Sequence, residues 1–349
     1  MNGPWDVRSD CTPGCATHAL PRVPVTGIAR RSVAFAHRVG RALADGGRMA
    51  DPARLRSHAR ALLDALGIRL DVQLDVQLDV ELDVRPEGPE PGGGASTARG
   101  GAFTARGGGP GALVVVNHIS WLDIPALLAV EPVTLLAKRE VDGWPVVGGL
   151  ARRAGTHFID RTDLRRLPDV VRELADLLAS GRSVAVFPQA TTWCTADRGT
   201  FRRATFQAAL DAGAPVRPVT VEYTQRGRPS TVAAFCGEET FLASLRRVLT
   251  ARELTVRITV HPQLTGEGAG EGLDRRSLAA SAERVVLGEG LAGGGQGRGS
   301  GSGDQRRGGG GPRALPLPRE REGAGCRSAA GSPGSPGGPA VSQALGTYL

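Results

Sequence analysis

His118 and Asp123 lie five positions apart and can form a general base and the carboxylate that orients it. They follow the apolar run 112–116, which predicts a buried strand, so both lie at the exit of that strand. A carboxylate beside a histidine fixes the imidazole tautomer and stabilises the imidazolium, which makes the histidine a general base. No serine or cysteine nucleophile accompanies them in an elbow-type turn. We therefore expect a base that acts on a hydroxyl supplied by the substrate.

An H-x4-D pattern alone is also compatible with a helix-capping histidine and a solvated aspartate. Further blocks of the sequence favour the catalytic interpretation. The segment N-H-x-S-x-x-D at 117–123 resembles the first signature block of the glycerolipid acyltransferases, the lysophosphatidic acid acyltransferase-like superfamily. Similar blocks follow in the family's order. The second is resembled by residues 138–140, Pro145, Gly148 and residues 158–161. The third is resembled by residues 187–192 and the fourth by residues 214–219.

The resemblance implies an α/β layered domain with a central mixed sheet flanked by helices. It implies an O-acyltransferase that moves a fatty acyl group from acyl-CoA or acyl carrier protein to the hydroxyl of a lysophospholipid, such as 1-acylglycerol 3-phosphate, in phospholipid biosynthesis. A lyso-ornithine lipid or another lyso-lipid is the alternative acceptor. A weakened, non-catalytic lipid-binding relative is the alternative from a different class of protein.

The same resemblance assigns roles to individual residues. Catalysis falls on His118 and Asp123, and substrate binding on residues of the blocks: Asn117, Ser120, Lys138, Arg161, Phe187, Pro188, Gln189 and Thr191. Arg161 is expected at the phosphate of the acceptor, which suits the fork geometry of a guanidinium. Backbone N–H groups at the helix N-terminus beside Ser120 are expected to stabilise the oxyanion. The acyl donor is a co-substrate, and no metal or other cofactor is expected.

The third block departs from the family's usual F-P-E-G-T. Gln189 stands where the family has glutamate, Ala190 where it has glycine, and Trp193-Cys194 replace small polar residues. An amide keeps the ability to hydrogen-bond but loses the negative charge. Alanine disfavours the positive φ that glycine permits. Both changes put the efficiency of catalysis and a glycerol 3-phosphate-type acceptor in question.

The composition divides the chain into five parts. We expect disorder over the Pro-rich residues 1–25, an N-terminal helical portion over 26–69, a repeat strand and Gly-rich linker over 70–110, the acyltransferase domain over 111–288, and a disordered Gly/Pro/Arg-rich tail over 289–349. Within the helical portion, 27–45 and 51–66 are predicted helices, the second with Asp51 as N-cap and Pro52 in its first turn. Its cationic face could lie at a membrane interface, although an ordinary helix covering the sheet fits better.

Residues 70–84 repeat Leu-Asp-Val with strict alternation, which indicates a strand that is too long for one compact domain. Beyond the signature, apolar runs alternate between helical and strand patterns. The predicted helices are 124–130, 167–179 and 206–212, and the predicted strands are 133–137, 183–187, 216–222 and 254–260.

The 349 residues carry a net charge of +8 and a pI near 10.1, which suits anionic partners. We expect no nucleic-acid partner, because the Arg/Gly segment at 293–313 lacks aromatic residues for stacking. No apolar run is long enough to span a bilayer and no signal peptide pattern begins the chain. The expected partners are the acyl donor, a lysophospholipid and a membrane surface, with a cytoplasmic location, peripheral on the inner face of the cell membrane.

The five cysteines form no disulfide framework, which fits a reducing compartment. Cys11-x3-Cys15-x2-His18 could be part of a metal site, but the sequence offers it no convincing fourth ligand.

Overall fold

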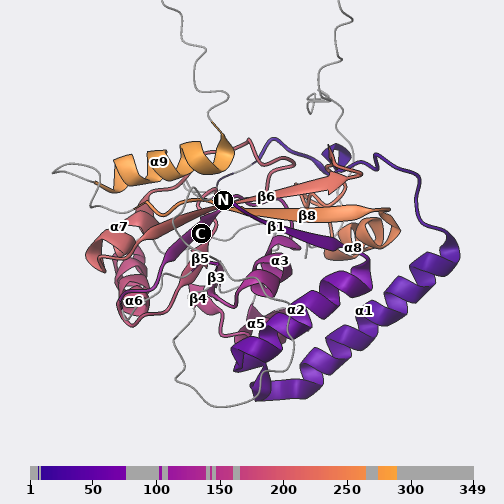
Figure 1. Ribbon diagram of the computed structural model, residues 1–349, viewed down its shortest axis with the longest axis horizontal. Coiled ribbons are helices and arrows are strands. Elements are labelled where there is room, and N and C mark those ends of the chain that lie inside the picture. The colour runs from indigo at the N-terminus through magenta and orange to yellow at the C-terminus, as the bar shows by residue number, and fades with distance from the viewer. Residues whose placement is uncertain are drawn as a thin grey trace, which may run out of the picture.

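The computed structural model describes residue 7 and residues 9–75, 102–103, 109–138, 142–143, 147–159, 166–264 and 274–288. The expected tail at 289–349, most of the linker, and the repeats beyond residue 75 lie outside these ranges. Figure 1 shows the described elements as a sheet with helices on both faces. This is the α/β layered architecture that the sequence predicts.

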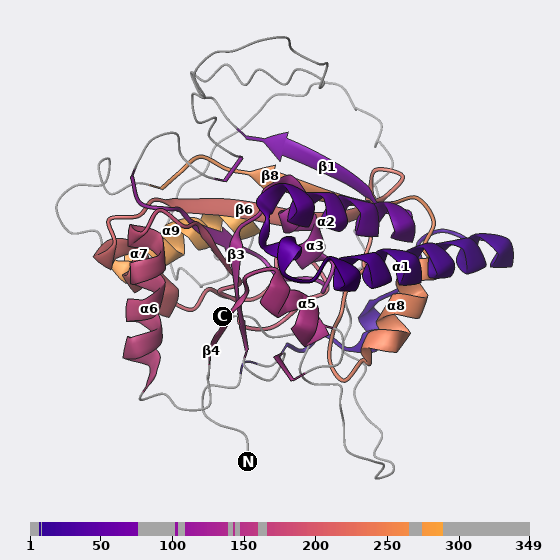
Figure 2. The same ribbon diagram turned by 90° about the horizontal axis from the view of Figure 1, so that it is seen from below.

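Both predicted N-terminal helices are present, and the first begins two residues earlier than predicted. They are α1 (Val25–Asp45) and α2 (Pro52–Leu66), joined by the 3-10 helix Gly46–Ala50. The Asp51 side chain caps α2 by accepting from the Arg54 N–H at 2.9 Å. Gly67 ends α2 at φ 70°, a left-handed conformation that glycine adopts without steric cost. Figures 1 and 2 agree that α1 and α2 lie side by side.

The sheet is mixed, as predicted. Its strands are β1 (Arg69–Leu74), β2 (Leu113–Val116), β3 (Thr134–Lys138), β4 (His157–Ile159), β5 (Val184–Val186), β6 (Val216–Gln225), β7 (Arg228–Pro229) and β8 (Leu254–Val260). The order is β1-β8-β6-β2-β5-β3-β4, with β7 paired to β6. All neighbours along this path are parallel except β6 and β8, which are antiparallel. The first Leu-Asp-Val unit thus becomes the edge strand β1.

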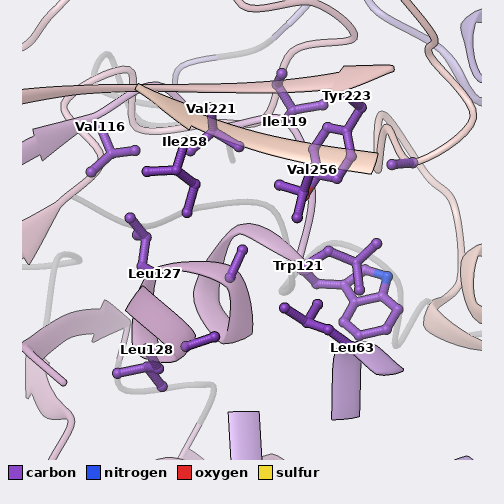
Figure 3. Packing of buried hydrophobic residues seen from close by; sticks show 14 of the residues in the cluster. Leu63, Val116, Ile119, Trp121, Leu127, Leu128, Val221, Tyr223, Val256 and Ile258 are labelled. Carbon is purple, nitrogen blue, oxygen red and sulfur yellow. The ribbon is translucent and has the colours of Figure 1, made fainter. Parts of the chain in front are cut away.

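Successive residues of β2 enter two hydrophobic cores on opposite faces of the sheet. Val114 and Val116 belong to the core beneath α2, α3 (Asp123–Val130) and α8 (Phe241–Thr250). Leu113 and Val115 belong to the other, covered by α6 (Leu167–Ala179), α7 (Ala204–Asp211) and α9 (Arg275–Leu287). A further helix, α5, spans Val147–Arg153. Figure 3 shows Val116, Val221 and Ile258 of the sheet facing Leu127 of α3. The site described below adjoins this core.

Helix α2 contributes an apolar face to that core. Leu55, Ala59, Leu63 and Leu66 are buried, and the Arg60 side chain donates to the Ala129 carbonyl of α3 at 2.9 Å. This packing favours the interpretation of α2 as a covering helix. Among the described helices, none has the length and apolar character needed to cross a membrane.

The expectation of disorder over residues 1–25 is wrong for residues 9–25. Cys11 and Ala16 are buried in the core, and a 3-10 turn spans Pro13–Cys15. The segment is also tied to the domain by the Val23 N–H, which donates to the Thr250 carbonyl at 3.1 Å. Proline content indicated disorder, but long-range contacts order this segment.

Candidate active site

The sheet order brings the first and third sequence blocks together. Strand β2 lies between β5 and β6 and is parallel to both. Parallel neighbours end at the same edge of a sheet, where α/β proteins commonly place their sites. The turn with His118 follows β2, and the segment Phe187-Pro188-Gln189 follows β5 at that edge.

The predicted histidine–aspartate pair is present. His118 Nδ1 lies 2.8 Å from Asp123 Oδ2, and both side chains are 0 % exposed. The same Oδ2 accepts the backbone N–H groups of Ile119 at 2.8 Å and Ser120 at 2.9 Å. An ionised carboxylate only accepts hydrogen bonds, so Nδ1 carries the hydrogen and Nε2 is the basic nitrogen of the ring.

Tyr223 completes the shell around the aspartate, and the sequence reasoning missed it. Its hydroxyl donates to Asp123 Oδ1 at 2.6 Å from the strand β6. Burial, followed by the negative charge of Asp123, raises the pKa of Tyr223 well above its usual value, so the hydroxyl remains a donor. A hydrogen bond also joins it to the Ser120 side chain. No local signal could have found Tyr223, because it is 100 residues from Asp123.

The Asn117 side chain joins the turn to β6 through two hydrogen bonds. Its Oδ1 accepts the Val221 N–H at 2.7 Å, and its Nδ2 donates to the Val221 carbonyl at 2.9 Å. The Ser120 hydroxyl accepts the Leu122 N–H at 3.2 Å. Both side chains are fully buried, so the structure gives them positioning contacts, and their predicted contact with substrate stays a prediction.

Three of the backbone N–H groups beside Ser120, where oxyanion donors are expected, are already engaged. The Ile119 and Ser120 N–H groups donate to Asp123, and the Asp123 N–H donates to the Ser120 carbonyl at 3.1 Å. An amide that holds the aspartate in place is not available to a developing oxyanion. These three groups position Asp123 and the turn, and the expectation of an oxyanion site at this helix N-terminus stays a prediction.

The third block packs behind the histidine. The Phe187 ring stacks on the His118 ring with centroids 4.2 Å apart. Gln189 Oε1 accepts the His118 backbone N–H at 2.5 Å, and its Nε2 donates to the Arg198 carbonyl. Pro188 is buried and Thr191 is half-buried. Gln189 thus uses both ends of its amide to position the histidine loop, a task that a carboxylate could do at only one end.

Ala190 adopts the conformation expected of the family's glycine, with φ 61°. This left-handed conformation costs an alanine roughly 1–2 kcal/mol because Cβ approaches the following carbonyl oxygen. The turn after β5 therefore retains its shape at the expense of local strain.

The second block remains incompletely placed. Lys138 is the last residue of β3, but its side chain and the whole of Arg161 lie outside the described residues. Their predicted roles toward anionic groups stay predictions. Phe158 is half-buried in β4 and packs against the core that adjoins the site.

The mixed sheet and the buried histidine–aspartate pair define an α/β protein with a histidine that is oriented by a carboxylate. Residues 98–222 match the family model described as Acyltransferase. The chain is 41% identical over 175 residues to a lyso-ornithine lipid O-acyltransferase of Pseudomonas aeruginosa, covering 50% of this chain and 66% of the relative. It is 34% identical over 176 residues to a 1-acyl-sn-glycerol-3-phosphate acyltransferase of Neisseria meningitidis, covering 50% of this chain and 68% of the relative.

The chain belongs to the glycerolipid acyltransferase superfamily. Among solved structures, the 1-acyl-sn-glycerophosphate acyltransferase PlsC of Thermotoga maritima aligns with 75% of this chain and 92% of its own. That alignment has a TM-score of 0.47 and 18% sequence identity.

Proposed function

We propose that this protein is an O-acyltransferase that esterifies the free hydroxyl of a lysophospholipid in phospholipid biosynthesis. The observation that carries the proposal is the 2.8 Å contact between His118 Nδ1 and Asp123 Oδ2 within the N-H-x4-D block. The intact pair also argues against the alternative of a non-catalytic lipid-binding relative.

In the proposed reaction, His118 Nε2 takes the proton of the acceptor hydroxyl as its oxygen attacks the thioester carbonyl of the donor. Asp123 stabilises the resulting imidazolium through Nδ1. Collapse of the tetrahedral intermediate breaks the carbon–sulfur bond, and the imidazolium proton goes to the departing thiolate. The products are an ester and a free thiol, so no net change in protons or electrons falls on the protein.

Access to the base is a requirement of this scheme. The His118 side chain has no exposed surface in the structure. Trp193, whose backbone N–H donates to the His118 carbonyl at 2.8 Å, belongs to the loop that continues the third block. In the proposed reaction, an acceptor hydroxyl reaches Nε2 only once the His118 side chain becomes accessible.

Two acceptors are supported by the named relatives. 1-Acylglycerol 3-phosphate is the acceptor that the Neisseria name implies, and lyso-ornithine lipid is the one that the Pseudomonas name implies. The second candidate has the higher identity in its favour, 41% against 34%. The donor would be acyl-CoA or an acyl carrier protein.

A membrane surface is the proposed location of the reaction, on the cytoplasmic face. Helix α1 supports this, because it exposes Arg30, Arg38 and Arg41 together with Val33, which is 71% exposed. Cationic and apolar side chains exposed on one helix suit an anionic lipid surface.

The test is an acyl-transfer assay with purified full-length protein on vesicles. Each lyso-lipid is offered with acyl-CoA and with acyl carrier protein, and products are identified by mass spectrometry. We expect esterification of one or both lyso-lipids, and its loss in His118→Ala. Absence of transfer with every pair of substrates, from a protein shown to be folded, would contradict the proposal.

A further inference from the structure

Four cysteines from three separate segments of the sequence meet in the structure. Cys11 Sγ lies 3.3 Å from Cys194 Sγ, and the Cys194 N–H points at Cys11 Sγ at 3.4 Å. The sulfurs of Cys11, Cys15 and Cys194 all lie within 4.8 Å of one another. The Cys236 thiol hydrogen-bonds to Cys11 as well. Cys11, Cys194 and Cys236 are 2%, 2% and 1% exposed.

The backbone is shaped to hold this cluster. The 3-10 turn Pro13–Cys15, in which the Cys15 N–H donates to the Thr12 carbonyl at 2.9 Å, returns Cys15 to the side of Cys11. Gly237 follows Cys236 at φ 62°, and a Cβ there would stand 3.2 Å from Pro13 Cδ and 3.3 Å from the Cys11 carbonyl oxygen. The N-terminal segment therefore lies close against the Cys236 loop, a fit that favours glycine.

We propose that Cys11, Cys194 and Cys236, with Cys15 in its reduced form, bind a structural Zn²⁺ ion. Tetrahedral zinc–thiolate sites have Zn–S bonds of about 2.3 Å, which corresponds to sulfurs roughly 3.8 Å apart. The 3.3 Å between Cys11 and Cys194, and the 4.8 Å limit on the separations among Cys11, Cys15 and Cys194, are compatible with this value. Cys236 joins the set through its hydrogen bond to Cys11. Each thiol gives its proton to solvent as the metal binds. Cys15 is disulfide-bonded in the structure, so it joins the site only after a thiol or phosphine reductant has supplied two electrons.

This set of ligands differs from the one that the sequence suggested. His18 completes the local pattern with Cys11 and Cys15, but its Nε2 lies by Thr250 Oγ1 at 3.3 Å and it is not part of the sulfur cluster. The ligands that the local pattern lacked come from the loop after the third block and from the segment after β7.

Two of the ligands adjoin residues that hold the catalytic turn. Cys194 follows Trp193, whose N–H donates to the His118 carbonyl at 2.8 Å. Cys236 follows Phe235, whose N–H donates to the Ile119 carbonyl at 2.9 Å and whose carbonyl accepts from the Thr192 hydroxyl. A metal would thus tie the N-terminal segment to both loops that fix the backbone around His118. The inference stands independently of the acyl-transfer proposal.

The test measures metal in the full-length protein, purified in a phosphine reductant from cells supplied with zinc. We expect about one Zn²⁺ per chain by elemental mass spectrometry, with the ratio falling at least fivefold in Cys194→Ser and in Cys236→Ser. His18→Ala is the matched control and keeps its metal. Co²⁺ offered to the metal-stripped wild type should give thiolate-to-metal absorption, which needs no variant to fold.

Metal retained in both serine variants, or no metal and no Co²⁺ absorption in the reduced wild type, would overturn the assignment. The assignment also fails if the His18→Ala protein loses its zinc while the Cys236→Ser protein keeps it, because that result restores the local Cys-Cys-His pattern. Melting with and without a chelator adds a functional measure, since removal of a structural metal should lower Tm in the wild type and not in Cys194→Ser.

Discussion

Replacement of Asp123 by asparagine should leave the tautomer of His118 unchanged, for a reason specific to this site. Three donors converge on Oδ2, namely His118 Nδ1 and the N–H groups of Ile119 and Ser120. An asparagine keeps all three only if its carbonyl oxygen takes the place of Oδ2. Its NH₂ then replaces Oδ1 and faces Tyr223, whose hydroxyl can turn and accept.

The magnitude follows from what this exchange removes. A hydrogen bond to a charged group contributes about 1.5–3 kcal/mol and one between neutral groups about 0.5–1.5 kcal/mol. The loss of charge therefore costs about 1–2 kcal/mol in the transition state, which corresponds to a decrease in kcat of about 5- to 30-fold. A wrong histidine tautomer would instead cost about 10⁴-fold.

The assay is kcat at saturating donor and acceptor for the wild type, Asp123→Asn, Tyr223→Phe and the double variant, with circular dichroism to verify folding. Tyr223→Phe is the control for the loss of the hydroxyl alone. The double variant leaves an unpaired buried NH₂, so we expect a further loss of unfolding free energy of about 1–3 kcal/mol. Nitrogen-15 NMR of labelled histidine reports the tautomer directly. A 10⁴-fold loss in folded Asp123→Asn, with the proton on Nε2, would refute the reasoning.

Three further substitutions test the site. His118→Ala should reduce kcat by about 10²–10⁴-fold or more, and near-wild-type turnover would remove the base from the mechanism. Gln189→Glu places a buried carboxylate against the Arg198 carbonyl, to which the amide now donates. Thermal unfolding should therefore show a loss of about 1–3 kcal/mol in the free energy of unfolding. The control Gln207→Glu, on the half-exposed surface of α7, should cost under about 1 kcal/mol. Equal losses would place Gln189 outside the hydrogen bonds described. Ala190→Gly removes the strain of a left-handed alanine and should raise the free energy of unfolding by up to about 1 kcal/mol. The control Ala243→Gly, within α8, should lower it by about as much. A lower Tm for both variants would contradict the inference that Ala190 is strained.

Much of the secondary structure could be predicted because its signals are local. Asp51, Pro52 and Gly67 mark both ends of α2, and alternation marks β8 at Leu254–Val260, where the strand is found. Helices α8 and α9 were not predicted, although Thr240 and Asp274 cap them by accepting the Ala243 and Ser277 N–H groups. The capping signals were present, and α8 also has apolar residues at helical spacing, Phe241, Leu245, Val248 and Leu249, so both helices could have been predicted.

The pair of His118 and Asp123 could be identified from the sequence, since residues on one strand-to-helix turn are held within reach by the backbone between them. The residues that surround that pair could be identified only from the folded domain. Tyr223 reaches Asp123 across 100 residues, Gln189 reaches His118 across 71, and Cys11 reaches Cys194 across 183. Such partners depend on which strands lie side by side in the sheet, and strand order arises from packing of the whole domain rather than from any local spacing.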